Sequence, residues 1–137
     1  SSDVCSSDLK TTSIGLAVAL FSSTAFGGSY LTGDELQKAF CGKTFMKGEN
    51  FNSGWTFKTF YTEKCNEITV HYLTGDKAGQ RFTWPLRIYP SGDHCVQRDG
   101  KDRCAKIEMV GDGIYHAISG GKPQYSREKP VDGNQLD

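Results

Sequence analysis

The sequence predicts a mostly β protein: a small antiparallel meander that closes as a barrel or packs as a sandwich, with one short N-terminal helix and two disulfides. Three observations predict this fold class. Segments rich in aromatic and β-branched residues recur at intervals of about ten residues, with glycine-containing turns between them. A single strong helix-start pattern precedes these segments. Four of the five cysteines lie in the part expected to fold, and an even number in a small exported chain is typical of a disulfide framework.

The first 27 residues are expected to lie outside the folded domain. Residues 1–9 (SSDVCSSDL) resemble a translated sequencing-adapter scar, so Cys5 is left out of the cysteine count. Residues 10–27 predict a cleaved signal peptide, because one lysine precedes an apolar run too short to anchor in a bilayer, and small residues follow it. The expected location is therefore periplasmic or secreted, with no stable membrane insertion after cleavage.

A single β-rich domain is expected over residues 28–119. Residues 120–137 are expected to form a polar, flexible tail, because they hold two prolines and few apolar groups. Of the 16 basic and 16 acidic residues, Lys10, Asp3 and Asp8 precede residue 28, which leaves 15 basic and 14 acidic groups. A near-neutral chain without a basic cluster predicts no nucleic-acid partner.

The clearest local pattern is a helix within residues 30–42 (YLTGDELQKAFCG). Thr32 and Glu35 have the spacing of a capping box, in which each side chain bonds the other residue's backbone N–H. Gly42 has the position of a left-handed cap that ends the helix. The apolar stripe, which is expected to cover one end or face of a sheet, comprises Leu36, Ala39 and Phe40.

Strands are expected at residues 55–62, 68–74, 81–89 and 114–119, with turns such as 75–79 between them. The third of these segments (RFTWPLRIY) alternates strictly, which places Phe82, Trp84, Leu86 and Ile88 on one face. Pro85 cannot donate a ladder hydrogen bond, which predicts that this strand lies at an edge or carries a bulge.

The stretch CVQRDGKDRC, residues 95–104, predicts a disulfide-bridged hairpin. Asp99-Gly100 is a strong two-residue turn pattern of the primed type. In that register Cys95 lies directly opposite Cys104 in a non-hydrogen-bonded pair, whose Cα atoms approach closely enough for a disulfide.

Alternation places this bridge on the outer face of the sheet. His94 and Val96, which flank Cys95, share a side with the apolar residues of the following strand, so the cysteines point the other way. Cys41 and Cys65 are then left to each other, which would tie the helix end to a turn between strands.

No pattern in the sequence predicts catalytic residues, a cofactor or a metal site. His71, His94 and His116 each lie alone in a different expected strand or strand end, without the convergent partners that a metal ion or a nucleophile needs. The cysteines lack the close C-x-x-C spacing of zinc and redox sites.

The aromatic residues are the remaining functional lead. The expected strands concentrate aromatic side chains, more than the core of a domain this size absorbs. They predict an aromatic pocket or patch that binds a small apolar ligand, a glycan or a partner protein; the alternative is that they only form core and cross-strand pairs. The candidate ligand or partner surface comprises Trp55, Phe57, Tyr72 and Trp84.

Three stretches resemble a family of small exported proteobacterial proteins, a domain of unknown function. They are LTGDELQKAFCGKTF, WPLRIYPSGDHCV and CAKIEMVGDGIYHA, within residues 31–118. The resemblance implies export and a compact β fold with an N-terminal helix, and it carries no catalytic residues. A second resemblance, to the small periplasmic β-barrel inhibitors of lysozyme, is one of architecture alone, because their Ser-Gly-x-x-Tyr loop is missing between the expected strands.

These observations favour an exported, non-catalytic binding or interaction protein whose ligand is unknown. The first alternative is a periplasmic inhibitor of a cell-wall enzyme or another envelope-protein partner, which would show a protruding loop or a flat aromatic patch. The second is a small hydrolase, which would show a cleft with two ionisable groups within hydrogen-bond reach. A closed cavity lined by Trp84 and Phe57 would instead favour a ligand carrier.

Overall fold

The computed structural model describes residues 29–137. The expected scar and signal peptide lie outside the described residues. One helix and eight strands make up the described chain, in the order α2 (Gly33–Phe40), β3 (Lys43–Asn50), β4 (Thr56–Tyr61), β5 (Glu67–Tyr72), β6 (Arg81–Ile88), β7 (His94–Arg98), β8 (Lys101–Gly111), β9 (Ile114–Ser119) and β10 (Lys122–Asp132).

The strands form a closed antiparallel barrel, which is the first of the two architectures that the sequence predicts. Each strand pairs with the next one along the chain, and β10 closes the barrel by pairing with β3. Closure leaves every strand of the ring paired with a neighbour on both sides, although β6 divides its length between its two neighbours. An eight-stranded barrel is just wide enough for its interior either to be filled by side chains or to hold one small ligand.

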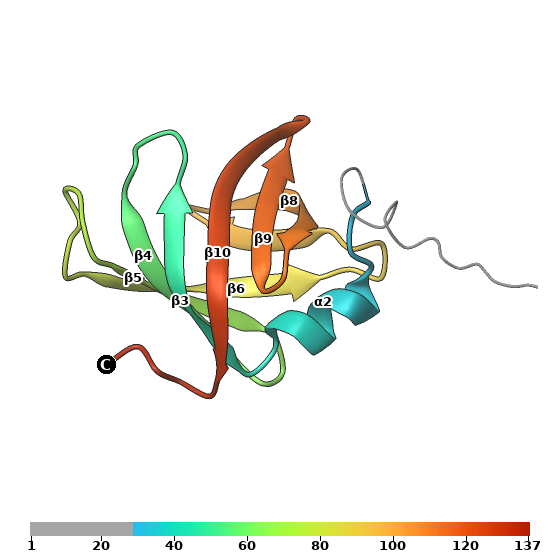
Figure 1. Cartoon of the computed structure of the whole chain (residues 1–137), viewed down its shortest axis with the longest axis horizontal. Coiled ribbons are helices and arrows are strands. Elements are labelled where there is room, and N and C mark those ends of the chain that lie inside the picture. Colours follow the sequence, from blue (N-terminus) through green and yellow to red (C-terminus); the bar gives the residue numbers. More distant parts are fainter. Residues whose placement is uncertain (1–28) are drawn as a thin grey trace, which may run out of the picture.

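The two ends of the barrel differ. Because the strands alternate in direction, the turns β3–β4, β5–β6, β7–β8 and β9–β10 lie together at one end, here named the open end. The other connections lie at the opposite end, here named the helix end, where α2 is packed (Figure 1). This difference decides where the interior is filled and where it is hollow.

The capping box that begins α2 is confirmed. The backbone N–H of Glu35 donates to Thr32 Oγ1 at 3.2 Å, and the backbone N–H of Thr32 donates to Glu35 Oε1 at 2.8 Å. The helix ends at Phe40, and Gly42 follows with a φ of 74°, as its expected capping position requires.

The helix end of the barrel is filled by aromatic rings. Leu36 and Phe40 of α2 are fully buried. The ring centroid of Phe40 lies 4.7 Å from that of Phe45, 5.1 Å from that of Tyr61 and 5.0 Å from that of Tyr115. The apolar stripe of α2 therefore plugs this end, and edge-to-face aromatic contacts stabilise the plug.

Both expected disulfides are present. Asp99 and Gly100 have φ angles of 52° and 74°, as a primed turn requires, and they place Cys95 opposite Cys104. The Cα atoms of that pair are 4.0 Å apart, and those of Cys41 and Cys65 are 5.2 Å apart. Cys104 is exposed, whereas Cys95 is buried but does not belong to the main hydrophobic core.

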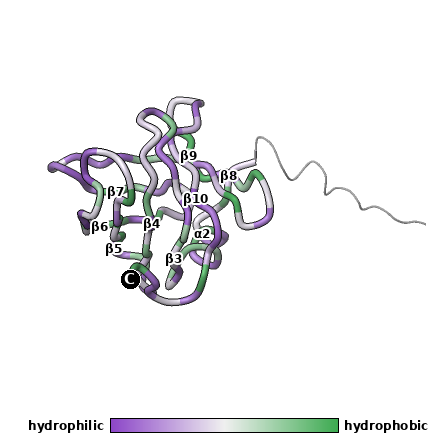
Figure 2. Tube along the Cα trace, turned by 60° about the vertical axis from the view of Figure 1, so that its left-hand side comes forward, coloured by the Kyte–Doolittle hydropathy of each residue, from purple (hydrophilic) through white to green (hydrophobic). Residues whose placement is uncertain are grey.

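Residues 122–132, which the sequence analysis places in a flexible tail, form the strand β10 that closes the barrel. The start of that expected tail, at Gly120 and Gly121, forms the turn of the β9–β10 hairpin. Figure 2 shows why hydropathy gives no strand pattern here, since most of β10 is hydrophilic. One of its inward-facing residues is an arginine, which the next subsection describes.

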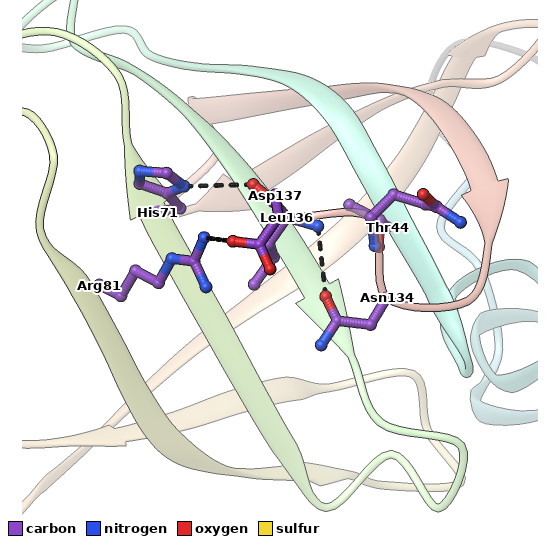
Figure 3. A network of polar contacts seen from close by, with 7 residues as sticks. Thr44, His71, Arg81, Asn134, Leu136 and Asp137 are labelled. Carbon is purple, nitrogen blue, oxygen red and sulfur yellow. Dashed lines mark hydrogen bonds and ion pairs between the residues drawn. The ribbon is translucent and has the colours of Figure 1, made fainter.

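The residues after β10 are also held against the barrel (Figure 3). The hydroxyl of Thr44 donates to the carbonyl of Gly133 at 2.6 Å. Leu136 is buried, and its carbonyl oxygen lies 3.4 Å from Nδ1 of His71. Arg81 forms an ion pair with Asp137. This C-terminal segment therefore runs across the outside of β3, β5 and β6 instead of extending away from the domain.

Candidate ligand-binding cavity

A cavity of about 690 Å³ occupies the open end of the barrel. Its rim includes Asn52 and Ser53 of the β3–β4 turn, Lys77 of the β5–β6 turn, and Ser119 at the end of β9. No helix among the described residues covers this end, so the space that α2 fills at the other end stays open here. The volume lies within the range of ordinary small-molecule sites.

Aromatic side chains form much of the cavity wall. All four candidate residues from the sequence analysis, Trp55, Phe57, Tyr72 and Trp84, lie in the cavity lining. Trp55 and Phe57 each meet Tyr72 edge to face, with ring centroids 6.1 Å apart in both pairs. Rings that are locked by such contacts present a preformed apolar surface.

The Phe57 ring reaches the interior because the neighbouring strand has no side chain beside it. Gly48 of β3 is paired with Phe57 of β4. A Cβ atom at Gly48 would lie 2.5 Å from Cε1 of that ring, closer than such atoms are found. Glycine at this position therefore sets the position of one wall of the cavity.

His94 lies at the floor of the cavity and is paired with Tyr61, which is fully buried and does not itself line the cavity. Nε2 of His94 lies 2.9 Å from the hydroxyl oxygen of Tyr61. Burial, with a smaller contribution from the charge of Arg127, lowers the pKa of His94 to about 3. Burial also raises the pKa of Tyr61 to about 12, although Arg127 acts in the opposite direction. Both side chains are therefore neutral around pH 7, and one shared hydrogen bond satisfies them.

Arg127 of β10 points into the same space. It is 6% exposed, and its guanidinium carbon lies 5.3 Å, 5.7 Å and 6.0 Å from the ring centroids of Tyr125, Tyr61 and Phe57. Its Nε atom is buried and has no hydrogen-bond partner. A buried cation with aromatic neighbours but no paired anion is costly to maintain, which makes it a candidate functional group.

A second arginine stands where the barrel wall is incomplete. Residues 81–85 of β6 pair with β5, whereas residues 86–88 pair with β7, so each half of β6 has one unpaired side. Pro85 lies at this change, in line with the expected edge position. Across the gap, the guanidinium of Arg98 lies 4.5 Å from the ring centroid of Trp84, and its Nε atom is buried without a partner.

The cavity lining carries more positive than negative charge. Its cationic residues are Lys77, Arg98, Arg103 and Arg127, and its anionic residue is Asp102. The whole chain has a formal net charge of +0. Positive charge is therefore concentrated around the cavity in an otherwise balanced molecule, and a low-dielectric wall strengthens the resulting field.

Sequence reasoning identified the aromatic wall of the cavity but not its polar groups. Arg98 lies in the segment expected to form the cysteine hairpin, and Arg127 lies in the expected tail. His94 had a usable signal, because it shares a strand face with Val96 and Ala105, and a histidine on an inward face is buried. The inward position of Arg127 could not be predicted, because the sequence pattern does not predict the strand β10 that carries it.

Other kinds of site receive no support from the described residues. Within 29–137, no group of three His, Cys, Asp or Glu side chains is placed to hold a metal ion. The four cysteines of this part of the chain are bonded in disulfides, so none offers a thiol nucleophile. In the same range, no helix is long and apolar enough to cross a membrane.

The fold and the cavity together define a class: a small eight-stranded antiparallel barrel, closed by a helix at one end and hollow at the other. Comparison of the chain with family models, with curated proteins and with solved structures returned no match. The function is therefore argued from the cavity itself.

Proposed function

We propose that this protein binds a small organic molecule in the open end of its barrel and does not catalyse a reaction. The observation that carries the proposal is the cavity of about 690 Å³, which has an aromatic wall and a polar floor. Sites for small ligands are typically concave and mostly apolar, with a few polar groups that orient the ligand. The barrel provides the concave shape, and its wall combines aromatic rings with several polar groups.

The hydrolase alternative draws on Tyr61 and His94, two ionisable groups within hydrogen-bond reach at 2.9 Å. A general base works best when its pKa is near the pH of the reaction. With pKa values of about 3 and about 12, this histidine is a weak base and this tyrosine a weak acid around pH 7. The pair is better suited to orient a ligand than to transfer a proton, which favours binding over hydrolysis.

The location that fits this function is the periplasm or the exterior of the cell. Disulfides persist in oxidising compartments and are rare in the cytosol. The described residues contain two disulfides, one between the end of α2 and the β4–β5 turn and one across the β7–β8 hairpin. An exported carrier would bind its ligand there. An inhibitor of a cell-wall enzyme would instead act through a protruding loop or a flat apolar patch, whereas the aromatic residues of interest line a cavity.

The direct test uses the neutral fluorophore N-phenyl-1-naphthylamine as the probe. Both tryptophans of the chain, Trp55 and Trp84, line the cavity, so a bound probe will quench them by energy transfer. We expect saturable quenching with about one probe per chain, accompanied by an increase in probe fluorescence. The absence of saturable binding to the folded protein would contradict the proposed function.

A matched pair of variants locates the bound probe. Val96 is 9% exposed and lines the cavity, so Val96→Phe occupies part of the ligand volume. Val131 is 38% exposed on β10 and does not line the cavity, so Val131→Phe makes the same chemical change elsewhere. Affinity for the probe should fall in the first variant and remain unchanged in the second. Equal affinity in both variants would place the probe outside the barrel.

A further inference from the structure

We propose that the ligand is an organic anion, in which a carboxylate or another oxyanion head pairs with Arg127 and an apolar, ring-containing body lies against the aromatic wall. This inference rests on the proposed function, because it names the chemical class of the molecule that occupies the same cavity.

The position of Arg127 is fixed by the two strands beside β10. Its register partners are Gly48 in β3 and Tyr115 in β9, so its side chain starts from the middle of a continuous sheet. Being 6% exposed, it cannot place its charge in bulk water in the way that a surface arginine does. The backbone therefore holds a cation inside the barrel.

No anion among the described residues 29–137 forms an ion pair with that cation. The ion pairs recorded for the described residues join Lys43 to Asp132, Lys47 to Glu128, Arg81 to Asp137 and Lys106 to Asp93, and none involves Arg127. The guanidinium is surrounded by the rings of Phe57, Tyr61 and Tyr125. Cation–π contacts offset only part of the cost of burying a charge, and the buried Nε–H donor has no partner.

A planar guanidinium with unused donors is suited to bind an oxyanion. Its N–H groups form a rigid fork that matches the two oxygens of a carboxylate or a phosphate. The adjacent Tyr61–His94 pair is neutral, so it places no negative charge beside an anionic head. The floor of the cavity therefore offers one positive charge and a polar, uncharged neighbour to an anionic head.

The mouth of the cavity has the same charge preference. Arg98 lies over Trp84, and Lys77 Nζ lies 5.1 Å from the ring centroid of Phe82. The Phe82 and Trp84 rings are themselves stacked, with an interplanar angle of 3° and centroids 5.5 Å apart. Cations held at the entrance will attract an anion, and the aromatic wall within the cavity offers an apolar surface for its body.

The test compares two probes that share one ring skeleton. N-phenyl-1-naphthylamine is neutral, and 8-anilinonaphthalene-1-sulfonate adds a sulfonate to the same rings. We expect the anionic probe to bind the wild-type protein at least about tenfold more tightly, which is the usual size of a charge-assisted hydrogen bond. Anionic compounds should also displace the neutral probe better than a neutral compound does. We therefore expect 1-naphthoate or 1-naphthyl phosphate to compete better than 1-naphthamide.

Arg127→Met separates a ligand-binding role from a structural one. If Arg127 is present for an anion, this variant should lose the preference for the anionic probe and keep its affinity for the neutral one. Its ligand-free melting temperature should rise, because an unpaired buried charge has been replaced by an apolar chain of similar length. A purely structural Arg127 would give the opposite result, a lower melting temperature and an unchanged preference.

Arg87→Met is the matched control, since Arg87 is exposed on β6 and does not line the cavity. It should keep the full preference for the anionic probe. If Arg127→Met does not fold, Arg127→Lys keeps the charge but lacks the planar fork, and it should bind the anionic probe more weakly than wild type does.

The outcomes also separate this inference from the proposed function. Saturable binding of both probes with equal affinity in wild type, or a preference that persists in Arg127→Met, would overturn the anion assignment alone. Failure of both probes to bind the folded wild-type protein would overturn the proposed function as well.

Discussion

His94 is buried at the floor of the cavity, where a protonated imidazole would stand beside the positive charge of Arg127. Both desolvation and that charge oppose protonation in the folded state, and they lower the pKa of His94 from 6.5 to about 3. In the unfolded chain neither effect operates. The same residue therefore binds a proton much more readily after unfolding, which links the stability of the barrel to pH.

The free energy of unfolding should fall as the pH is lowered from about 6.5 towards 3. In that window the unfolded chain carries a proton on His94 and the folded chain does not, so each proton taken up favours unfolding. The full effect is on the order of 5 kcal/mol, and it is absent above pH 7. Urea denaturation at a series of pH values measures it directly.

A substitution isolates the contribution of His94 from that of the carboxylates. His94→Gln keeps a hydrogen-bonding group near Tyr61 but does not titrate, so its stability should be nearly flat down to about pH 4.5, where carboxylates begin to protonate. The control is His116→Gln, which changes a histidine whose ring packs on Phe51 outside the core. An equally steep pH dependence in wild type and His94→Gln would show that His94 is not responsible.

The aromatic residues of the cavity wall could be predicted from the sequence, whereas the polar residues of its floor could not. Trp55, Phe57, Tyr72 and Trp84 were identified because large rings concentrated in a few strands are visible in the sequence. Arg127 was missed because an arginine in a polar segment looks like any solvated side chain. Its burial results from barrel closure, which is a non-local property.

The helix α2 can be predicted from local sequence patterns, whereas the strand β10 cannot. The capping box of α2 is formed by residues three positions apart, so its geometry follows from local sequence alone. The strand β10 gives no alternating hydrophobic pattern, because its inward residues at the open end, Tyr125 and Arg127, line a cavity instead of a core. Departures from the hydrophobic pattern are expected at functional sites, and this one coincides with the proposed ligand site.

The contact between β3 and β4 yields a prediction about the shape of the cavity. Gly48→Ala would place a Cβ atom 2.5 Å from Cε1 and 2.8 Å from Cδ1 of Phe57, so the ring must turn away from its present position. We expect a loss of about 1–3 kcal/mol in the free energy of unfolding, as for other overpacked sites. Affinity for N-phenyl-1-naphthylamine should fall as well, since the displaced ring changes the wall.

Two further variants establish that the ring is the cause. Gly111→Ala makes the same change in β8, where the nearest atom is Cδ1 of Ile114 at 3.3 Å, the mobile end of a side chain. Its stability should stay within about 1 kcal/mol of wild type, the usual range for small changes at sites that can adjust. Adding Phe57→Leu to Gly48→Ala should recover part of the lost stability. A double variant that is less stable than the sum of the two single changes would refute this explanation.

The sequence patterns predict an antiparallel meander but do not distinguish a closed barrel from a sandwich. Closure depends on β10 reaching back to β3, which brings Asp132 opposite Lys43. The C-terminal segment then continues across the outer surface, where Leu136 is buried. Neither contact has a local pattern, because each joins residues that are far apart in the chain, whereas the two disulfides could be paired from a single two-residue turn.

The two disulfides should contribute differently to stability and to binding. Cys41–Cys65 spans 24 residues and ties the C-terminal end of α2 to the β4–β5 turn, whereas Cys95–Cys104 spans 9 residues and braces the hairpin that carries Arg98. Loop-closure entropy predicts a loss of about 3.5 kcal/mol on removing the first and about 2.7 kcal/mol on removing the second. Replacing each pair by alanine and measuring urea denaturation tests this order.

Removing the Cys95–Cys104 disulfide should weaken ligand binding more than removing Cys41–Cys65, which is the reverse of their effects on stability. The Cys41–Cys65 bridge lies at the helix end, so its removal should leave the affinity for 8-anilinonaphthalene-1-sulfonate unchanged while the protein remains folded. Removing Cys95–Cys104 frees the hairpin beside the cavity mouth, where β7 is already unpaired with the first half of β6, and Arg98 loses its fixed position over Trp84. Affinity for the anionic probe should then fall, because an ordered cation at the entrance becomes mobile. Equal affinities in the two double variants would mean that the hairpin takes no part in binding, and the site would reduce to the floor around Arg127.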